Sequence, residues 1–261
     1  MLRELAIGWA LTLGLVVARV AAFVVVSPFP GQATPKTQRV GLVFVLTVAA
    51  MAGRVPIPKL FDVTSVAPFV VKELAIGALI GLVFRVAIAG AEVAGELASQ
   101  ALGLGSPSLY NPALGTQETS ISRVFSTFAL LVALSMGAHR VVIQMLLGSF
   151  DALPVAAGAS PSLAAPVLAE IIGQAIGLGV RMALPVLAVS LAIQAGLALI
   201  ARVAPSLQVF NVGFAILIGA GLLVLAASAR EIFRPLVESL GSLPLRIDRV
   251  LTEIAPPSGQ P

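Results

Sequence analysis

The chain has 261 residues, of which 58% are apolar and only 11% are charged, and its formal net charge is +4. A soluble globular domain is about half apolar and about a quarter charged, so this chain lacks the charged surface that a soluble monomer needs. Together with a mean hydropathy of +1.04, the composition predicts a protein that lies in a membrane or inside a larger apolar assembly.

The residue counts also exclude several kinds of site. The sequence has no cysteine and a single histidine, His139, which excludes thiolate metal sites, disulfides and metal motifs that need two histidines. Its arginines are scattered rather than gathered in a basic block, so the sequence has no typical nucleic-acid surface. We therefore expect no metal ion, no cofactor and no nucleic-acid partner.

Apolar stretches recur along the whole chain, separated by short segments rich in proline, glycine and charge. The first is too long for the apolar part of a cleavable signal peptide and is predicted to be a retained helix. Each of the last two stretches is about as long as the roughly 20 residues that cross a bilayer core. The two are predicted to form a helical hairpin. Hydropathy alone predicts about five or six helices. The stretches are Leu5–Val26, Val40–Gly53, Val66–Leu102, Val124–Phe150, Met182–Ala201 and Val203–Ala229.

Two of these stretches suit lipid poorly. Val40–Gly53 is too short to cross a bilayer alone, and charges are spaced through Val66–Leu102, where an uncompensated arginine costs about 3 kcal/mol on insertion scales. We expect neighbouring protein chains to cover part of these helices. The chain is predicted to be one membrane domain over residues 1–261. It has a helical core at 1–229, a loop at 103–122 and a charged tail at 230–261, whose last residues are expected to be disordered.

No enzyme class is favoured by the candidate residues. A serine hydrolase would need a serine beside His139, and the nearest match, Ser160, stands before a proline in a connector. An aspartyl protease would need two carboxylates on neighbouring helices, but the acidic side chains gather in one stretch or at helix ends. We therefore expect no catalytic residues.

Two membrane functions stay open from the charges alone. Glu92, Glu96 and Gln100 recur every four residues on one helix face, which suits either a hydrophilic conduit or a face turned to water. A stand-alone proton-coupled transporter would use Glu73, Arg85 and Glu170, with arginines of the apolar stretches as ion partners for Glu73 or Glu170. The alternative for these arginines, which are Arg19, Arg85 and Arg181, is snorkelling or pairing at a subunit interface.

Short motifs follow one another in a fixed order between residues 19 and 229. They are Arg19, Pro28-Phe29, Pro35, Arg39, Gly95-Glu96-Leu97, Tyr110-Asn111-Pro112, Gly137-Ala138-His139, Ser149-Phe150 with Leu153-Pro154, Ala183-Leu184-Pro185, and the run from Ala201 to Phe214. This ordered series resembles the FliR/SctT family of type III secretion export apparatus proteins. Asn111, Gln208 and Ala215 depart from the family pattern. The motifs favour the flagellar FliR branch over the injectisome SctT branch, which remains the alternative.

The resemblance implies an all-α, membrane-associated protein whose helical hairpins pack into a multi-subunit, cone-shaped export gate. It implies a non-enzymatic channel subunit for unfolded flagellar substrates, located in the bacterial inner membrane at the flagellar basal body. The implied partners are FliP-like and FliQ-like subunits and an FlhB-like protein, besides membrane lipid. No cofactor is implied.

The resemblance also assigns roles to residues. A loop from Gly105 to Thr119 would plug the channel, with four residues nearest the lumen: Leu109, Tyr110, Asn111 and Pro112. The run from Arg202 to Phe214 is expected to be a structural turn and helix start, with tight packing at Gly213. The structural motif residues are Arg19, Pro28, Gly95, Gly137, His139, Ser149, Phe150, Pro154, Pro185, Arg202, Pro205, Phe210, Gly213 and Phe214.

Overall fold

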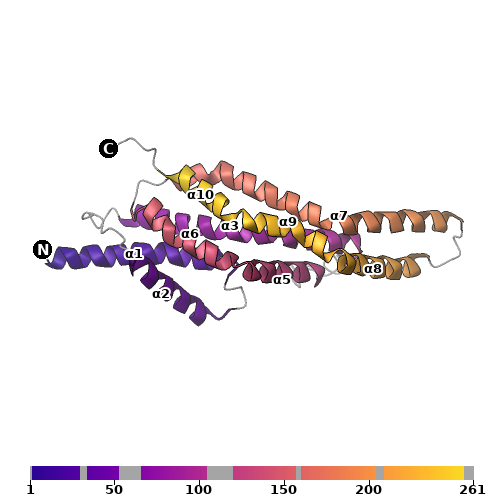
Figure 1. The fold of residues 1–261 in the computed structure, drawn as a ribbon, viewed down its shortest axis with the longest axis horizontal. Helices are drawn as coiled ribbons and strands as arrows, with labels where there is room; N and C mark the ends of the chain where they lie inside the picture. Colours follow the sequence, from indigo (N-terminus) through magenta and orange to yellow (C-terminus); the bar gives the residue numbers. More distant parts are fainter. Residues whose placement is uncertain are drawn as a thin grey trace. The chain divides into compact units, whose positions relative to one another are not determined.

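The computed structural model describes residues 2–29, 34–52, 66–104, 120–156, 160–203 and 209–255. Every regular element within these ranges is a helix (Figure 1), which confirms the all-α prediction. The ranges contain nine α-helices and one 3₁₀-helix: α1 (Leu2–Val26), α2 (Lys36–Ala52), α3 (Val66–Ala101), α5 (Ser120–Ser135), α6 (Ala138–Ala152), η3 (Pro161–Ala164), α7 (Ala165–Val203), α8 (Val209–Ala227), α9 (Ala229–Gly241) and α10 (Leu243–Ile254).

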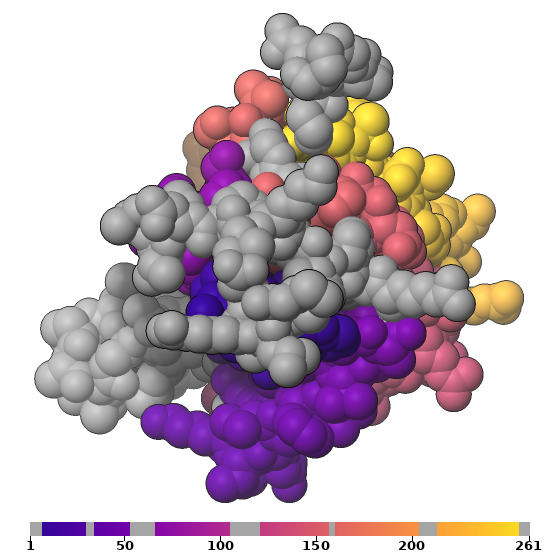
Figure 2. Space-filling view, turned by 90° about the vertical axis from the view of Figure 1, so that its left-hand side faces the viewer, coloured from indigo at the N-terminus to yellow at the C-terminus, as the bar shows by residue number. Residues whose placement is uncertain are grey.

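The chain divides into two compact units that interleave along the sequence. The first comprises Met1–Val86, Gly137–Ile172 and Gly241–Pro261, and the second comprises Ala87–Met136 and Gly173–Leu240. In the first unit α1 packs against α2, α6 contacts α2 and α10, and α10 contacts η3. Figure 2 shows the surface of α2 (violet) beside that of α1 (indigo). Helices from the beginning, middle and end of the sequence therefore build one unit.

Glycines of α3 let α1 approach its backbone in the first unit. A Cβ atom added at Gly77 would collide with the carbonyl oxygen of Arg19, and one added at Gly81 would lie 3.0 Å from the carbonyl oxygen of Phe23. Small residues spaced four apart allow this close approach of helices. The small-residue pattern at Gly77 and Gly81 is therefore a true packing motif.

The same helix uses two further glycines in the second unit. A Cβ atom at Gly90 would lie 2.9 Å from the carbonyl oxygen of Ala175 in α7. At Gly95 it would lie 2.5 Å from Cα of Ser122 in α5, and the Ser122 hydroxyl donates to the carbonyl oxygen of Glu92 over 3.2 Å. The helices α5 and α7 thus pack against α3 at positions where α3 has a glycine and therefore no side chain of its own.

The apolar stretch Val124–Phe150 forms two helices rather than the continuous helix that its hydropathy predicts. α5 and α6 are bent by 68° at a short break, where Gly137 has a φ of 73°. Glycine enters this left-handed region without steric cost, whereas hydropathy does not register backbone conformation. A second break separates α8 from the helices after it, with a bend of 57°. The helices therefore outnumber those expected from hydropathy.

α7 and α8 form the hairpin predicted from the two charge-free stretches. The sequence predicts the turn of this hairpin near Arg202–Pro205. α7 ends at Val203 and α8 begins at Val209, and residues 204–208 between them lie outside the described ranges. A second small-residue pattern, at Gly173 and Gly177 of α7, meets no atom within 4 Å at either added Cβ atom. Unlike the pair in α3, these two glycines do not bring helices together within the described chain.

The charged residues after position 229 form two amphipathic helices. In α9 the buried residues include Ile232 and Leu236, and in α10 they include Ile247 and Val250. The charged residues Arg234 and Arg249 are exposed. A 3.6-residue apolar period of this kind is typical of helices that lie on a protein surface.

Within the described ranges, three helical segments are long and apolar enough to cross a membrane: Ile7–Val26, Val66–Ala101 and Pro161–Val203. The number rises to five if each of the two bent pairs is counted as one span. These segments agree with the expectation of a multi-helix membrane protein.

We expect Gly77→Ala to destabilise the protein, since the added methyl group meets the Arg19 carbonyl and overpacking costs about 1–3 kcal/mol. The control is Gly14→Ala in α1, where nothing lies within 4 Å of an added Cβ atom. It should raise helix stability slightly, because alanine is favoured over glycine by up to about 1 kcal/mol. Thermal unfolding followed by circular dichroism compares the two. A Gly77→Ala protein as stable as the control would contradict the close approach of α1 and α3.

Candidate functional site

Arg19 of α1 is completely buried in the first unit and forms an ion pair with Glu73 of α3. Its Nε–H donates to Glu73 Oε2 over 2.6 Å, and the exposed fractions of the two side chains are 0% and 2%. A charge can be buried at tolerable cost only when it is paired and its hydrogen bonds are satisfied. Arg19 lies in an otherwise apolar helix, so its partners determine how this unit packs.

The guanidinium group also caps the C-terminal end of α6. Nη1 donates to the carbonyl oxygen and the hydroxyl of Ser149 over 3.0 and 3.2 Å, and Nη2 donates to the carbonyl oxygen of Leu153 over 3.0 Å. Carbonyl groups in the last turn of a helix lack helical partners and carry partial negative charge, which a cation stabilises. The Arg19 Cζ atom also lies 4.4 Å from the centroid of the Phe150 ring, a cation–π contact.

Glu73 extends the cluster into the connector after α6. Its second oxygen, Oε1, accepts a hydrogen bond from the backbone N–H of Ala156 over 3.1 Å. Ala156 has a positive φ of 64°, which is uncommon for a residue with a side chain. We call Arg19, Glu73, Ser149, Phe150, Leu153 and Ala156 the Arg19 cluster. It joins α1, α3, α6 and the start of the connector to η3.

The Arg19 cluster suits a structural role better than proton transport. Glu73 already pairs with Arg19, while Glu170 pairs with Arg249 over 3.0 Å on the surface. Arg85 is exposed and stands 12 residues after Glu73 in α3, about 18 Å along the helix axis. The structure does not bring together the three residues that a transporter would use.

No group of three or more histidine, cysteine or acidic residues that could hold a metal ion occurs within the described ranges. Because all three guanidinium nitrogens of Arg19 donate hydrogen bonds within the cluster, its chemistry is that of a fixed structural cation.

The sequence model of the family described as "Bacterial export proteins, family 1" matches residues 10–243. The chain belongs to this family of bacterial export proteins.

The curated relatives with this similarity share one name, "Flagellar biosynthetic protein FliR". The protein from Escherichia coli K12 is 28% identical over 87% of this chain and 92% of its own length. The protein from Aquifex aeolicus is 30% identical over 84% and 85% of the two chains. The match to the Pectobacterium carotovorum protein is 32% identical but spans only 59% of each chain. The resemblance found in the motifs is thus confirmed over most of the sequence.

In this export-family chain, four of the motif residues meet in the Arg19 cluster: Arg19, Ser149, Phe150 and Leu153. Pro154 follows Leu153 and is exposed. The sequence offers Glu73, beside Glu170, as one of two ion partners for the arginines of the apolar stretches, and it offers Leu153 only as part of a motif. A signal for Glu73 was present, because an acidic and a basic residue in two apolar helices satisfy one another best as a pair. The role of Leu153 depends on its backbone carbonyl and has no sequence signal.

A second group of motif residues lies at helix ends of the first unit. His139 is at the start of α6, after Gly137, and its ring lies 5.7 Å from that of Phe29, between centroids. Pro28, which precedes Phe29, is half-buried. These residues pack the segment after α1 against the start of α6.

A further group of motif residues lies in the second unit, whereas Pro35 and Arg39 lie in the first, at the start of α2. A Cβ atom at Gly213 of α8 would lie 2.7 Å from Cδ1 of Leu197 in α7, and the ring of Phe214 approaches Gly103. Gly95 lies at the contact of α3 with α5, Pro185 is half-buried inside α7, and Arg202 is exposed in its last turn. The motif residues therefore do not form one site.

The predicted gate loop lies outside the described residues, as does Pro205. Leu109, Tyr110, Asn111 and Pro112 all fall in the range 105–119. Phe210 belongs to α8, but its side chain is outside the description. The roles predicted for these residues stay predictions.

Arg19→Met should lower the free energy of unfolding by about 3–5 kcal/mol, because it leaves Glu73 buried without a partner. The double variant Arg19→Met/Glu73→Leu should be more stable than the single variant, since no charge then stays buried. As a control, Arg249→Met breaks a pair whose side chains are 61% and 46% exposed, and should cost at most about 1 kcal/mol. Chemical unfolding of the purified proteins measures all three. A double variant less stable than Arg19→Met would refute the pairing.

Proposed function

We propose that this protein is a non-enzymatic subunit of the flagellar type III protein export gate and forms part of the channel for unfolded flagellar substrates. The observation that carries the proposal is the family match over residues 10–243. The names of the relatives support it, since all six describe flagellar biosynthesis and the match to the Escherichia coli relative covers 92% of that protein. The family match and these names support a component of the flagellar export apparatus. The part in the channel is the further step of the proposal.

The exposed apolar surface of the chain supports a place in a multi-subunit membrane complex. In the most apolar window of Pro161–Val203, only 17% of the residues are buried within the chain. Ile176, Leu191 and Leu199 are among the exposed side chains. Apolar patches of this extent mark surfaces covered by lipid or by protein. We assign this surface to partners resembling FliP, FliQ and FlhB, in the inner membrane at the flagellar basal body.

The Arg19 cluster supports the structural part of the proposal. A channel subunit that passes unfolded chains needs a scaffold whose helices do not separate during transport. The ion pair and the carbonyl contacts of Arg19 connect three helices of the first unit through side chains shielded from water. Separating these helices would expose unpaired charge to an apolar environment, which is costly.

The first test is the dependence of the chain on partner subunits. We expect the protein expressed alone to be degraded faster by protease than the protein co-expressed with FliP-like and FliQ-like subunits, which would cover its exposed apolar helices. Native mass spectrometry should show one complex that contains all three chains. A well-behaved monomer with equal protease resistance in both preparations would contradict the proposal.

Function is tested in a flagellated bacterium that lacks its own relative of this protein. Restored motility and secretion of flagellar proteins, when the compatible partner genes are supplied, would support the flagellar assignment. Complementation of an injectisome mutant instead would favour the SctT alternative. An assembled complex that secretes in neither system would refute the export role.

The proposed gate loop has its own test. We expect deletion of Leu109 to Pro112 to leave the complex assembled but the membrane permeable to small ions, because a loop at membrane depth is tolerated only where protein or water satisfies its backbone. Dye entry into cells that carry the deletion is compared with recovery of the complex. The matched control deletes four residues of the C-terminal segment after Ala255 and should cause no leak. An intact complex without added permeability would remove this loop from the gate.

A further inference from the structure

The face of α7 that carries Arg181 is uncovered within the described part of the chain. Arg181 is exposed and is the only charged residue between Glu170 and Arg202. Val180 and Leu184 beside it are apolar and are 41% and 53% exposed. None of the ion pairs and hydrogen bonds of the described residues includes Arg181. A single cation therefore stands on an apolar surface of this helix.

Two glycines precede Arg181 on the same face of α7. Gly173, Gly177 and Arg181 follow one another every four residues, so neighbouring members are about 6 Å apart along the helix axis and about 40° apart around it. A Cβ atom added at either glycine meets no atom within 4 Å. The buried side of the helix is a different one, with Ala175 and Met182 among its residues. The two glycines thus leave a strip of bare helix backbone beside the cation.

Bare backbone of this kind suits another helix. A glycine in a helix interior costs up to about 1 kcal/mol relative to alanine, and small residues spaced four apart let two helices approach closely. Two glycines of α3, Gly77 and Gly81, meet α1 in this way, whereas Gly173 and Gly177 meet no helix of the described chain. An arginine in apolar surroundings also needs an opposite charge. A helix that packs on the two glycines of α7 and bears a carboxylate meets both needs.

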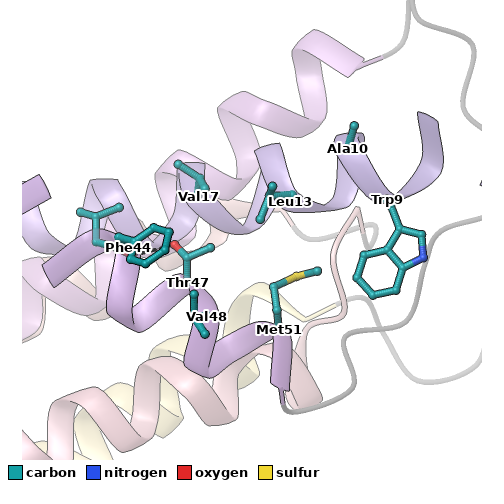
Figure 3. A pocket seen from close by; sticks show the side chains of 9 residues that line it. Trp9, Ala10, Leu13, Val17, Phe44, Thr47, Val48 and Met51 are labelled. Carbon is teal, nitrogen blue, oxygen red and sulfur yellow. Dashed lines mark hydrogen bonds between the residues drawn. The ribbon is translucent and has the colours of Figure 1, made fainter. Parts of the chain in front are cut away.

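The groove between α1 and α2 in the first unit has no comparable charge. Figure 3 shows that apolar side chains such as Leu13, Phe44 and Met51 make up most of its walls. No charged residue lines it, and the hydroxyl of Thr47 donates to the carbonyl oxygen of Val43 over 2.7 Å. The lining of the groove therefore does not select a partner by charge, as Arg181 does on α7.

We propose that Gly173, Gly177 and Arg181 form a docking face for one helix of a partner subunit, and that this helix carries an aspartate or glutamate opposite Arg181. A lipid phosphate would also neutralise Arg181. A flexible acyl chain, however, packs on side chains as well as on glycines, so the two glycines favour a protein helix. The inference rests on the proposed function, since the export complex supplies the partner.

The first test compares two glycines of α7 in the complex with FliP-like and FliQ-like subunits. Gly177→Leu should lower recovery of the complex about tenfold, because the added side chain holds the partner helix away. The control, Gly196→Leu, makes the same change about 100° around the helix, where an added Cβ atom also meets no atom within 4 Å. Circular dichroism checks that both variants keep their helical content. Equal recovery of the complex with the two variants would overturn the docking face.

The second test varies the charge at Arg181. Arg181→Lys should keep most of the complex because it keeps the positive charge, whereas Arg181→Glu should lower recovery more than about tenfold because it opposes like charges. The control, Arg140→Glu, changes an exposed residue of α6 at a place where the first helical turn favours a glutamate. Assembly of Arg181→Glu at the level of this control would overturn the proposal. If the unaltered chain failed to assemble with these subunits, the proposed function would fail as well.

A charge exchange identifies the partner residue. In cells that carry Arg181→Glu, each aspartate and glutamate of the partner subunits is replaced by lysine, one at a time, and secretion of flagellar proteins is measured. We expect one such substitution to restore secretion, since it forms the pair again with its charges reversed. Failure of every substitution would overturn the proposal. So would native mass spectrometry in which the unaltered complex retains a phospholipid that Arg181→Gln loses, since a lipid headgroup would then be the partner of Arg181.

Discussion

The burial of one arginine in an apolar helix is the constraint on which the first unit depends. Arg19 can leave water only if its charge is paired and its N–H groups are satisfied. Those partners come from α3, from the end of α6 and from the connector beyond it. The glycine at position 77 belongs to the same arrangement, because it lets the backbone that carries Arg19 lie directly against α3. Charge, helix capping and close packing are thus parts of one interaction.

This chain reverses the usual distribution of polar and apolar side chains in a soluble protein. Its ion pair between α1 and α3 is shielded from water, while leucine, isoleucine and valine side chains of α7 and α8 are exposed. Apolar exposure is costly only in water, and helices long and apolar enough to cross a membrane indicate surroundings other than water. Helix contacts inside the chain combine small residues and polar pairing with buried large apolar side chains such as Phe84, Leu146 and Leu236. The glycines of α3 show the part played by small residues, since they lie at the contacts of this helix with α1, α5 and α7.

Sequence reasoning predicted the helical class, the apolar surroundings and the family, because composition, hydropathy and motif order are properties of the chain itself. It did not decide which carboxylate pairs with Arg19, since Glu73 lies 54 positions away and Glu170 was the other candidate. The bend at Gly137 was missed because it arises from a backbone angle within a continuously apolar stretch. The carbonyl of Leu153 had no signal, as any residue at that position carries one. Local pattern determines which residues become helical, whereas tertiary packing determines which of them meet.

The late position of α10 in the sequence has a consequence for biosynthesis. Domains generally fold from the N-terminus as the ribosome extends the chain, yet α10 is the last described helix and covers α6 and η3 of the first unit. Those surfaces must stay uncovered while residues 173–240 of the second unit are translated. The ion pair of α1 with α3 can form earlier, since both helices have by then left the ribosome. The nascent protein would thus pass through a stage in which Arg19 is paired with Glu73 while α6 and η3 are still uncovered. Translation of α10 then covers them.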